Sequence, residues 1–183
     1  YAEVFNKLGL KDYQLKVNNR KILEGVAETA GCLDKFKTLT IAIDKFDKIG
    51  DEGVKKELLE KGFTEKNVNT ILSFTKSFAF TEEGLSEIEA QIATSTIGIE
   101  GVEEMRTILR HLDASKPSIN LEIDLKLARG LDYYTGCIFE VIPTTVQMGS
   151  ISGGGRYDNL TEIFGLKDVS GVGISFGLDR IYD

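Results

Sequence analysis

Residues 125–136 read LKLARGLDYYTG, in which an alternating apolar stretch ends at an arginine and two adjacent tyrosines follow. Alternation of this kind is typical of a strand with one covered face. The apolar positions are Leu121, Ile123, Leu125 and Leu127. Arg129 continues their phase, so a strand would turn its guanidinium toward the covered face. Because an unpaired buried charge is costly, Arg129 needs an anion. The residues leave two partners open: an internal carboxylate, Asp132 or Glu140, or an anionic ligand held by the planar guanidinium fork.

The tyrosines after Arg129 are the next candidate ligand residues. Tyr133 and Tyr134 are adjacent, so in an extended chain they face opposite sides. One can pack while the other offers a phenol to a polar ligand. Two aromatic residues filling a sheet edge is the simpler alternative.

Two glycine-rich stretches follow. In ISGGGRYDNL, residues 151–160, the glycines permit a bulge or the close approach of a ligand. In SGVGISFGLDR, residues 170–180, a strand would alternate a core-forming face with a flat face suited to a planar ring such as a purine. The first face holds Val172, Ile174 and Phe176, and the second holds Gly171, Gly173, Ser175 and Gly177. Arg180 then stands in the first turn of a helix, where a cation is unfavourable unless an anion is present.

The composition is that of a globular protein. The 183 residues are 42% hydrophobic and 28% charged, and the formal net charge of -7 argues against binding nucleic acid by bulk electrostatics. No stretch is apolar enough to span a membrane, and no secretory leader is visible. The two cysteines, Cys32 and Cys137, lack neighbouring metal ligands, which favours free thiols in a reducing cytoplasm.

Three regions differ in their residue patterns. Residues 1–20 predict a helix end, a turn near Gly9 and a short strand, YQLKVNN. Residues 21–116 predict a helical insertion domain, with helices that end near Gly31, Gly50 and Gly62. Residues 117–183 predict strands in SINLEIDLKLA, GCIFEVIP, QMGSIS and VSGVGISFG. We therefore expect an α+β fold: part of an antiparallel sheet flanked by helices, interrupted in sequence by the insertion.

LARGLDYYTG, SGGGRYDNL and GVGISFGLDR resemble, in this order, signature stretches of the histidyl-tRNA synthetase family. GVGISFGLDR is similar to motif 3 of class II aminoacyl-tRNA synthetases, and LKVNNRKILEGV resembles the segment that leads into the family's insertion domain. The resemblance implies ATP-dependent ligation of L-histidine to tRNA(His) through histidyl-adenylate. It also implies a cytoplasmic enzyme that is a homodimer at full length and takes ATP with Mg2+, whose ligands cannot be identified in this sequence.

The resemblance implies a role for each matching residue. Arg129 would be catalytic and bridge the histidine carboxylate and the α-phosphate of ATP, and Arg180 would hold the γ-phosphate. The histidine pocket would comprise Arg129, Tyr133, Tyr134, Tyr157, Gly154 and Gly155, with Gly153 beside them. The ATP site would comprise Arg129, Arg180, Gly171, Gly173 and Gly177.

The sequence lacks stretches that resemble motifs 1 and 2 and a C-terminal anticodon-binding domain. We therefore expect a piece of a longer protein that cannot form histidyl-adenylate alone. An alternative with the same fold is the synthetase-like regulatory subunit of ATP phosphoribosyltransferase in histidine biosynthesis, but Arg180 and the long insertion favour the synthetase.

A second alternative is an interaction module, in which the helical region binds RNA or protein. Its candidate phosphate contacts are Lys16, Arg20 and Lys21, or Lys35, Lys37, Lys45 and Lys48, although solvated helix faces explain these charges as well. Nucleophilic catalysis is disfavoured because the single histidine, His111, lies in a helical stretch without a Ser or Cys elbow.

Overall fold

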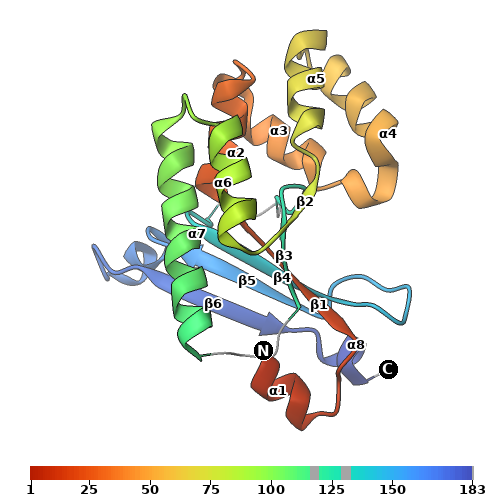
Figure 1. Ribbon diagram of the computed structural model, residues 1–183, viewed down its shortest axis with the longest axis vertical. Coiled ribbons are helices and arrows are strands. Elements are labelled where there is room, and N and C mark those ends of the chain that lie inside the picture. The colour runs from red at the N-terminus through yellow and green to blue at the C-terminus, as the bar shows by residue number, and fades with distance from the viewer. Residues whose placement is uncertain (116–119, 129–132, 183) are drawn as a thin grey trace.

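A computed structural model of the chain describes residues 1–115, 120–128 and 133–182. A six-stranded sheet with the order β2-β3-β1-β4-β5-β6 lies at its centre (Figure 1). The strands are β1 (Tyr13–Asn19), β2 (Ser77–Ala79), β3 (Leu121–Asp124), β4 (Cys137–Pro143), β5 (Ser152–Tyr157) and β6 (Gly171–Phe176). The predicted α+β class, with a sheet flanked by helices, is confirmed.

Most helices lie between β1 and β3 in sequence. The α-helices are α1 (Ala2–Lys7), α2 (Arg20–Thr29), α3 (Phe36–Ile43), α4 (Phe46–Glu60), α5 (Glu65–Ser73), α6 (Glu82–Gln91), α7 (Thr96–Ser115) and α8 (Leu178–Tyr182). Two 3-10 helices are η1 (Leu33–Lys35) and η2 (Leu160–Phe164). Side-chain oxygens of Asn19, Thr64 and Thr81 accept hydrogen bonds from the first turns of α2, α5 and α6, which fixes where these helices begin.

The strand pairing brings the two ends of the chain into one sheet. β1 pairs in parallel with β3, with Leu15 opposite Leu121, and antiparallel with β4. The other pairs are antiparallel, so the sheet differs from the wholly antiparallel prediction by the β1–β3 pair. Parallel neighbours need a long connection. The helices between β1 and β3, at the top of Figure 1, form that connection.

Two buried clusters form the core, and α2 belongs to both. Ile22 and Val26 of α2 pack in the cluster beneath α6 and α7 against the sheet. Leu23 and Ala27, one position along the helix, pack in the cluster with α3, α4 and α5. Apolar residues four apart lie on one helix face. Two adjacent pairs of this kind allow α2 to join the sheet layer to the outer helices.

α2 and α7 approach each other closely because glycines face one another. A Cβ added to Gly25 would lie 2.7 Å from the Cα atom of Gly98. A Cβ added to Gly101 would lie 2.9 Å from the backbone nitrogen of Ile22. Side chains at these positions would push the helices apart, so the glycines fix the position of α7 over the start of α2.

Several predicted elements differ in the structure. The helical region contains β2, which pairs with β3. β3 ends at Asp124 because the Asp124 side chain accepts a hydrogen bond from the Lys126 backbone N–H, which closes a turn. Residues 147–151 form no strand, and the glycine run instead lies inside β5. A helical segment ends at Gly50 as expected, where φ is positive and the chain kinks, but a second helical segment follows directly within α4.

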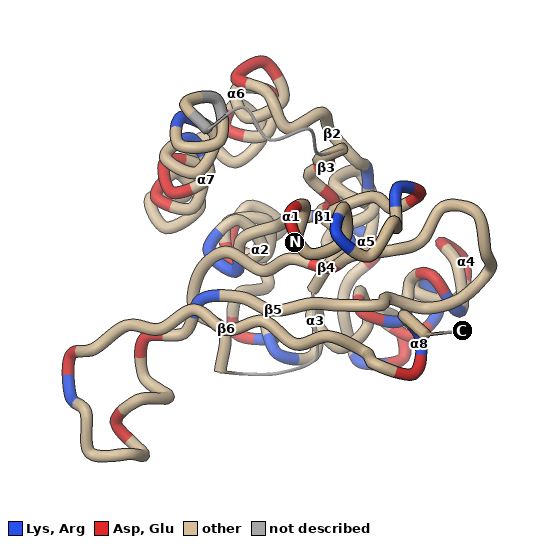
Figure 2. Tube along the Cα trace, turned by 90° about the horizontal axis from the view of Figure 1, so that it is seen from below, with Lys and Arg blue, Asp and Glu red and all other residues tan. Residues whose placement is uncertain are grey.

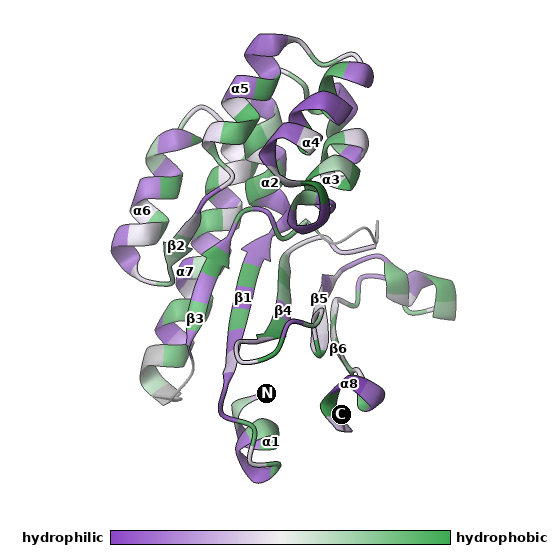
Figure 3. Cartoon of the chain, turned by 90° about the vertical axis from the view of Figure 1, so that its right-hand side faces the viewer, coloured by the Kyte–Doolittle hydropathy of each residue, from purple (hydrophilic) through white to green (hydrophobic). Residues whose placement is uncertain are grey.

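The predicted core face of β6 is wrong for this chain. Val172 is 68% exposed, Ile174 53% and Phe176 39%. Together with Tyr1 and α7, the first two line an apolar groove of about 580 Å³ on the side of the sheet where α1 lies. Alternation correctly placed these three side chains on one face, but nothing among the described residues covers most of it. Figure 3 shows the corresponding alternation of hydrophobic and hydrophilic residues along β1, whose apolar side chains are buried.

Candidate functional site

Three tyrosines from two segments form a cluster at one end of β5. The rings of Tyr133 and Tyr134 lie 4.5 Å apart between centroids, and the Tyr133 hydroxyl donates to the Tyr134 hydroxyl at 3.3 Å. The ring of Tyr157 meets that of Tyr133 edge-on at 6.3 Å. Tyr134 is 8% exposed, whereas Tyr133 is 37% exposed. One tyrosine is therefore buried and its neighbour reaches solvent. Their rings nevertheless lie together and do not face opposite sides as expected, because neither residue lies in a strand.

The glycines of β5 and β6 make room for these rings. A Cβ on Gly155 would lie 2.7 Å from the Tyr134 ring, and one on Gly171 would lie 2.3 Å from the Tyr157 ring. Gly173 faces the same side, with Tyr157 3.4 Å from its Cβ position. Gly154 faces the other side, toward the Phe139 ring. The flat glycine face predicted from alternation is present, and the Tyr157 ring occupies part of it.

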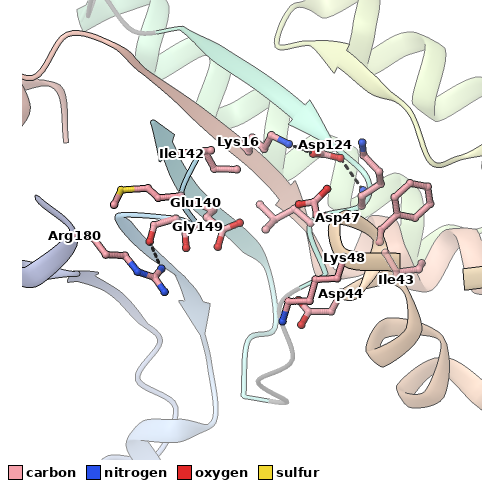
Figure 4. A pocket seen from close by; sticks show the side chains of 15 residues that line it. Lys16, Ile43, Asp44, Asp47, Lys48, Asp124, Glu140, Ile142, Gly149 and Arg180 are labelled. Carbon is pink, nitrogen blue, oxygen red and sulfur yellow. Dashed lines mark hydrogen bonds and ion pairs between the residues drawn. The ribbon is translucent and has the colours of Figure 1, made fainter. Parts of the chain in front are cut away.

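Arg180 lies at the other end of β5 and β6, beside a cavity of about 460 Å³ (Figure 4). Its guanidinium donates to the backbone oxygen of Ser150 at 2.5 Å, and Gly149 lies against it. Gly177 lies nearby, where a Cβ would be 3.8 Å from the Arg180 side chain. Within the described ranges, no ion pair joins Arg180 to a carboxylate, so its charge remains available to an anion.

The wall of the cavity opposite Arg180 contains a buried ion pair. The Lys16 ammonium lies 2.6 Å from the Asp124 carboxylate, and their side chains are 16% and 3% exposed. Burial would lower the pKa of Lys16, but the hydrogen bond and charge of Asp124, aided by Asp47 and Glu122, raise it. Lys16 is therefore firmly protonated. Figure 4 shows Asp47 and Lys48 of α4 on the same side of the cavity as this pair.

The predicted candidates are only partly brought together. The cluster of Tyr133, Tyr134 and Tyr157 lies with Gly155, Gly171 and Gly173, while Gly177 and Arg180 lie at the cavity. Arg129 and Asp132 lie outside the described residues. Lys16 and Asp124 were not predicted as site residues. For Lys16, the strand YQLKVNN contained a usable pattern: Lys16 alternates with the apolar Leu15 and Val17, so its side chain faces the opposite side of the sheet, where the cavity lies.

The basic residues weighed as RNA contacts are mostly engaged within the fold. Arg20 is 6% exposed and donates to the backbone oxygen of Ala128, and Lys21 pairs with Glu100 and Glu104. Lys45 pairs with Glu57. Figure 2 shows basic residues spread over several elements with acidic residues among them. His111 is on the exposed surface of α7, as expected. Both cysteines are free, and none of the described helices has the length and apolar character that a bilayer crossing requires.

Comparison with known proteins identifies the family. A family model described as histidyl-tRNA synthetase matches residues 1–181. The chain belongs to the histidyl-tRNA synthetase family. A relative named histidine–tRNA ligase, from Christiangramia forsetii, is 54% identical over 187 aligned residues, which cover 100% of this chain and 40% of the relative. The chain thus spans about two fifths of the length of this ligase.

Solved structures agree with this family assignment. The crystal structure of histidyl-tRNA synthetase from Nostoc sp. PCC 7120 superposes with a TM-score of 0.89 at 32% identity, covering 98% of this chain and 43% of that one. A protein from Bacillus halodurans C, titled an ATP phosphoribosyltransferase regulatory subunit/histidyl-tRNA synthetase, gives a TM-score of 0.80 at 16% identity, covering 98% of this chain and 46% of that one. The second likeness shows a shared fold alone. The resemblance carried by LARGLDYYTG, SGGGRYDNL and GVGISFGLDR is therefore confirmed at the level of the histidyl-tRNA synthetase family.

Proposed function

We propose that this chain supplies part of the histidine and ATP sites of a histidine–tRNA ligase, which joins L-histidine to tRNA(His) through histidyl-adenylate. The observation that carries the proposal is the family match over residues 1–181, with the tyrosine cluster and the Arg180 cavity at opposite ends of one glycine-lined surface. The regulatory subunit of ATP phosphoribosyltransferase has weaker support, because that likeness is one of fold at 16% identity.

The tyrosine cluster is the proposed histidine pocket. Tyr133, Tyr134 and Tyr157 place phenol groups together, and a phenol can hydrogen-bond an imidazole nitrogen. A pocket built to hydrogen-bond a polar side chain rejects analogues that leave its polar groups unpaired. Gly153, Gly154 and Gly155 complete the segment assigned to this pocket, with Gly155 beneath the Tyr134 ring.

The two arginines are the proposed anion-binding groups. Arg129, outside the described residues, would bridge the histidine carboxylate and the α-phosphate. A carboxylate oxygen then attacks the α-phosphorus, its bond to pyrophosphate breaks, and a fixed guanidinium stabilises the charge that develops. Arg180 would bind the γ-phosphate; it lies beside the cavity and forms no ion pair with any carboxylate in the described residues, which supports this role. Of the glycines assigned to the adenine, Gly177 lies at this end of β6, whereas Gly171 and Gly173 lie at the other end against the Tyr157 ring.

Mg2+ would enter with ATP. Among the residues described, no group of three His, Cys, Asp or Glu side chains is arranged to hold a metal ion. The metal is proposed as part of the nucleotide substrate. We also propose a cytoplasmic homodimer at full length. In the proposed domain division, residues 21–116 form the helical insertion between catalytic segments 1–20 and 117–183.

The test uses the Christiangramia forsetii ligase with its matching segment replaced by these 183 residues, which we call the hybrid ligase. We expect histidine-dependent pyrophosphate exchange and charging of tRNA(His) by the hybrid ligase, and none by the isolated chain. Arg129→Ala should lower the exchange rate far more than it lowers the unfolding temperature. A folded hybrid ligase without exchange activity, or one that Arg129→Ala leaves fully active, would contradict the proposal.

A further inference from the structure

A chain of polar contacts outside the proposed substrate pockets connects helix α7 to the tyrosine cluster. It begins at Glu104, whose side chain is 25% exposed. One carboxylate oxygen accepts a hydrogen bond from the Asn19 amide at 2.7 Å, and the other lies 3.0 Å from the Lys21 ammonium. Asn19 is fully buried and caps α2, so these contacts attach Glu104 to the junction of β1 and α2.

Glu104 also faces the segment that follows the tyrosines. Its carboxylate lies 4.0 Å from the guanidinium of Arg156, and a Cβ on Gly136 would come within 3.2 Å of it. Burial and the negative charge of Glu104 raise the pKa of Cys137 to about 12. The carboxylate therefore acts electrostatically on the start of β4 as well as on β5.

Arg156 connects Glu104 to the turn that carries the tyrosines, through hydrogen bonds with Asp158 and Thr135. Its Nε donates to the Asp158 carboxylate at 3.0 Å, and the other Asp158 oxygen accepts from the Thr135 hydroxyl at 2.7 Å. The Thr135 backbone N–H also donates to the Arg156 backbone oxygen at 3.0 Å. Thr135 directly follows Tyr134, so the Arg156–Asp158 pair fixes the end of the turn that carries both tyrosines.

The position of Glu104 is itself set by backbone packing. Gly98 and Gly101, both on α7, allow that helix to contact α2 closely. Glu104 follows Gly101 by three residues and hence lies on the same face of α7. A shift of α7 relative to α2 would move the carboxylate away from Asn19 and Arg156 together.

We propose that Glu104 is a positioning residue, which transmits the placement of α7 through Arg156 and Asp158 to Tyr133 and Tyr134 and thereby sets the histidine pocket. This inference rests on the proposed function, because it concerns binding of the histidine substrate. It adds a contact that affects histidine binding, from a helix whose described side chains line neither the tyrosine cluster nor the cavity at Arg180.

The test is Glu104→Gln in the hybrid ligase. Glutamine retains an oxygen that can accept from Asn19, but it removes the charge that faces Arg156. Partly exposed charge pairs contribute up to about 1 kcal/mol, so we expect a two- to fivefold rise in the KM for histidine. The kcat and the KM for ATP should stay within about twofold, because the cavity beside Arg180 is not in this chain of contacts.

The matched control is Glu100→Gln, which lies on the same helix and loses a contact to the same lysine, with a 3.2 Å distance to Lys21. It should leave the KM for histidine unchanged. Arg156→Lys tests the path from the other end: it retains a cation but loses the Nε donor to Asp158, and it should raise the same KM. In an Arg156→Gln background, Glu104→Gln should have little further effect.

The outcomes separate the two proposals. A parent hybrid ligase that is inactive with histidine contradicts the proposed function. An active parent with an unchanged KM for histidine in Glu104→Gln overturns the positioning role alone. An equal rise in Glu100→Gln, or a full additional rise in the Arg156→Gln background, overturns it as well, because either result would show a general effect of α7.

Discussion

The buried pair between Lys16 and Asp124 supports a quantitative prediction. Asp124→Asn removes a carboxylate that is 3% exposed and leaves an ammonium that is 16% exposed without its 2.6 Å partner. Removing one member of a buried pair costs about 3–5 kcal/mol. The charges of Asp47 and Glu122 still act on Lys16, so we expect the lower end, about 3 kcal/mol.

Urea unfolding of the 183-residue chain measures this loss. With a slope near 2 kcal/mol per molar urea, the midpoint should fall by about 1.5 M. Glu3→Gln is the matched control: it breaks the 2.9 Å pair of Lys7 and Glu3, whose side chains are 74% and 82% exposed. Such exposed pairs contribute less than about 1 kcal/mol.

The pH dependence of stability and a double variant test whether the charge pair of Lys16 and Asp124 causes this loss of stability. The folded pKa of Lys16 is raised above its ordinary 10.5, so the stabilisation by the pair is complete below pH 10.5 and is lost as pH rises through the folded pKa. Parent and Asp124→Asn midpoints should therefore converge at alkaline pH. Lys16→Met with Asp124→Leu should cost less than Asp124→Asn alone. A loss below about 1 kcal/mol in Asp124→Asn, or a double variant less stable than the single one, would refute this reasoning.

Three further predictions concern the site and its support. Gly155→Ala places a Cβ 2.7 Å from a tyrosine ring and should raise the KM for histidine in the hybrid ligase while costing about 1–3 kcal/mol of stability. Gly25→Ala gains about 1 kcal/mol of helix propensity but overlaps the backbone of α7, so the urea midpoint should fall; an unchanged or higher midpoint would contradict the close helix packing. The Thr135 hydrogen bond, aided by Arg156, lowers the pKa of Asp158, so its contribution is present above pH 3.8 and is lost as pH falls through the folded pKa. Asp158→Asn should remove that part of the acid-induced fall in unfolding temperature.

Local patterns predicted much of the fold. β1 occupies Tyr13–Asn19, the stretch predicted as a short strand; its apolar side chains are buried, and Lys16 on the other face lines the cavity. Gly9, Gly31 and Gly62 all have positive φ where turns or helix ends were expected, since glycine adopts that conformation without a Cβ clash.

The features that sequence reasoning missed depend on distant partners. β2 has three residues and is a strand because β3, more than forty residues later, pairs with it. The face of β6 with Val172 was expected to be covered, whereas burial depends on what packs against a strand and not on its own alternation.

The sequence predicted which types of residue form the site better than it predicted how they are arranged in space. Tyr134 is buried and Tyr133 is partly exposed, but their rings contact each other, whereas an extended chain would have placed them on opposite sides. The line of contacts from Glu104 to Asp158 was beyond prediction, because it joins α7 to β5 across more than fifty residues of sequence. No sequence periodicity relates Glu104 to Arg156 or Asp158. They lie close together because α7 packs on α2.

The parallel pairing of β1 with β3 has a consequence for synthesis of the chain. Leu15 of β1 pairs with Leu121 of β3, about a hundred residues later, so the two central strands cannot pair until β3 has been synthesised. At roughly 5–20 residues per second, the ribosome needs on the order of 5–20 s to deliver that partner. During this interval the outer helices can already assemble, because their contacts are local. The backbone N–H and C=O groups along both edges of β1 remain unpaired and can bind other chains. Nascent chains arrested before β3 emerges should therefore be the forms most dependent on chaperones.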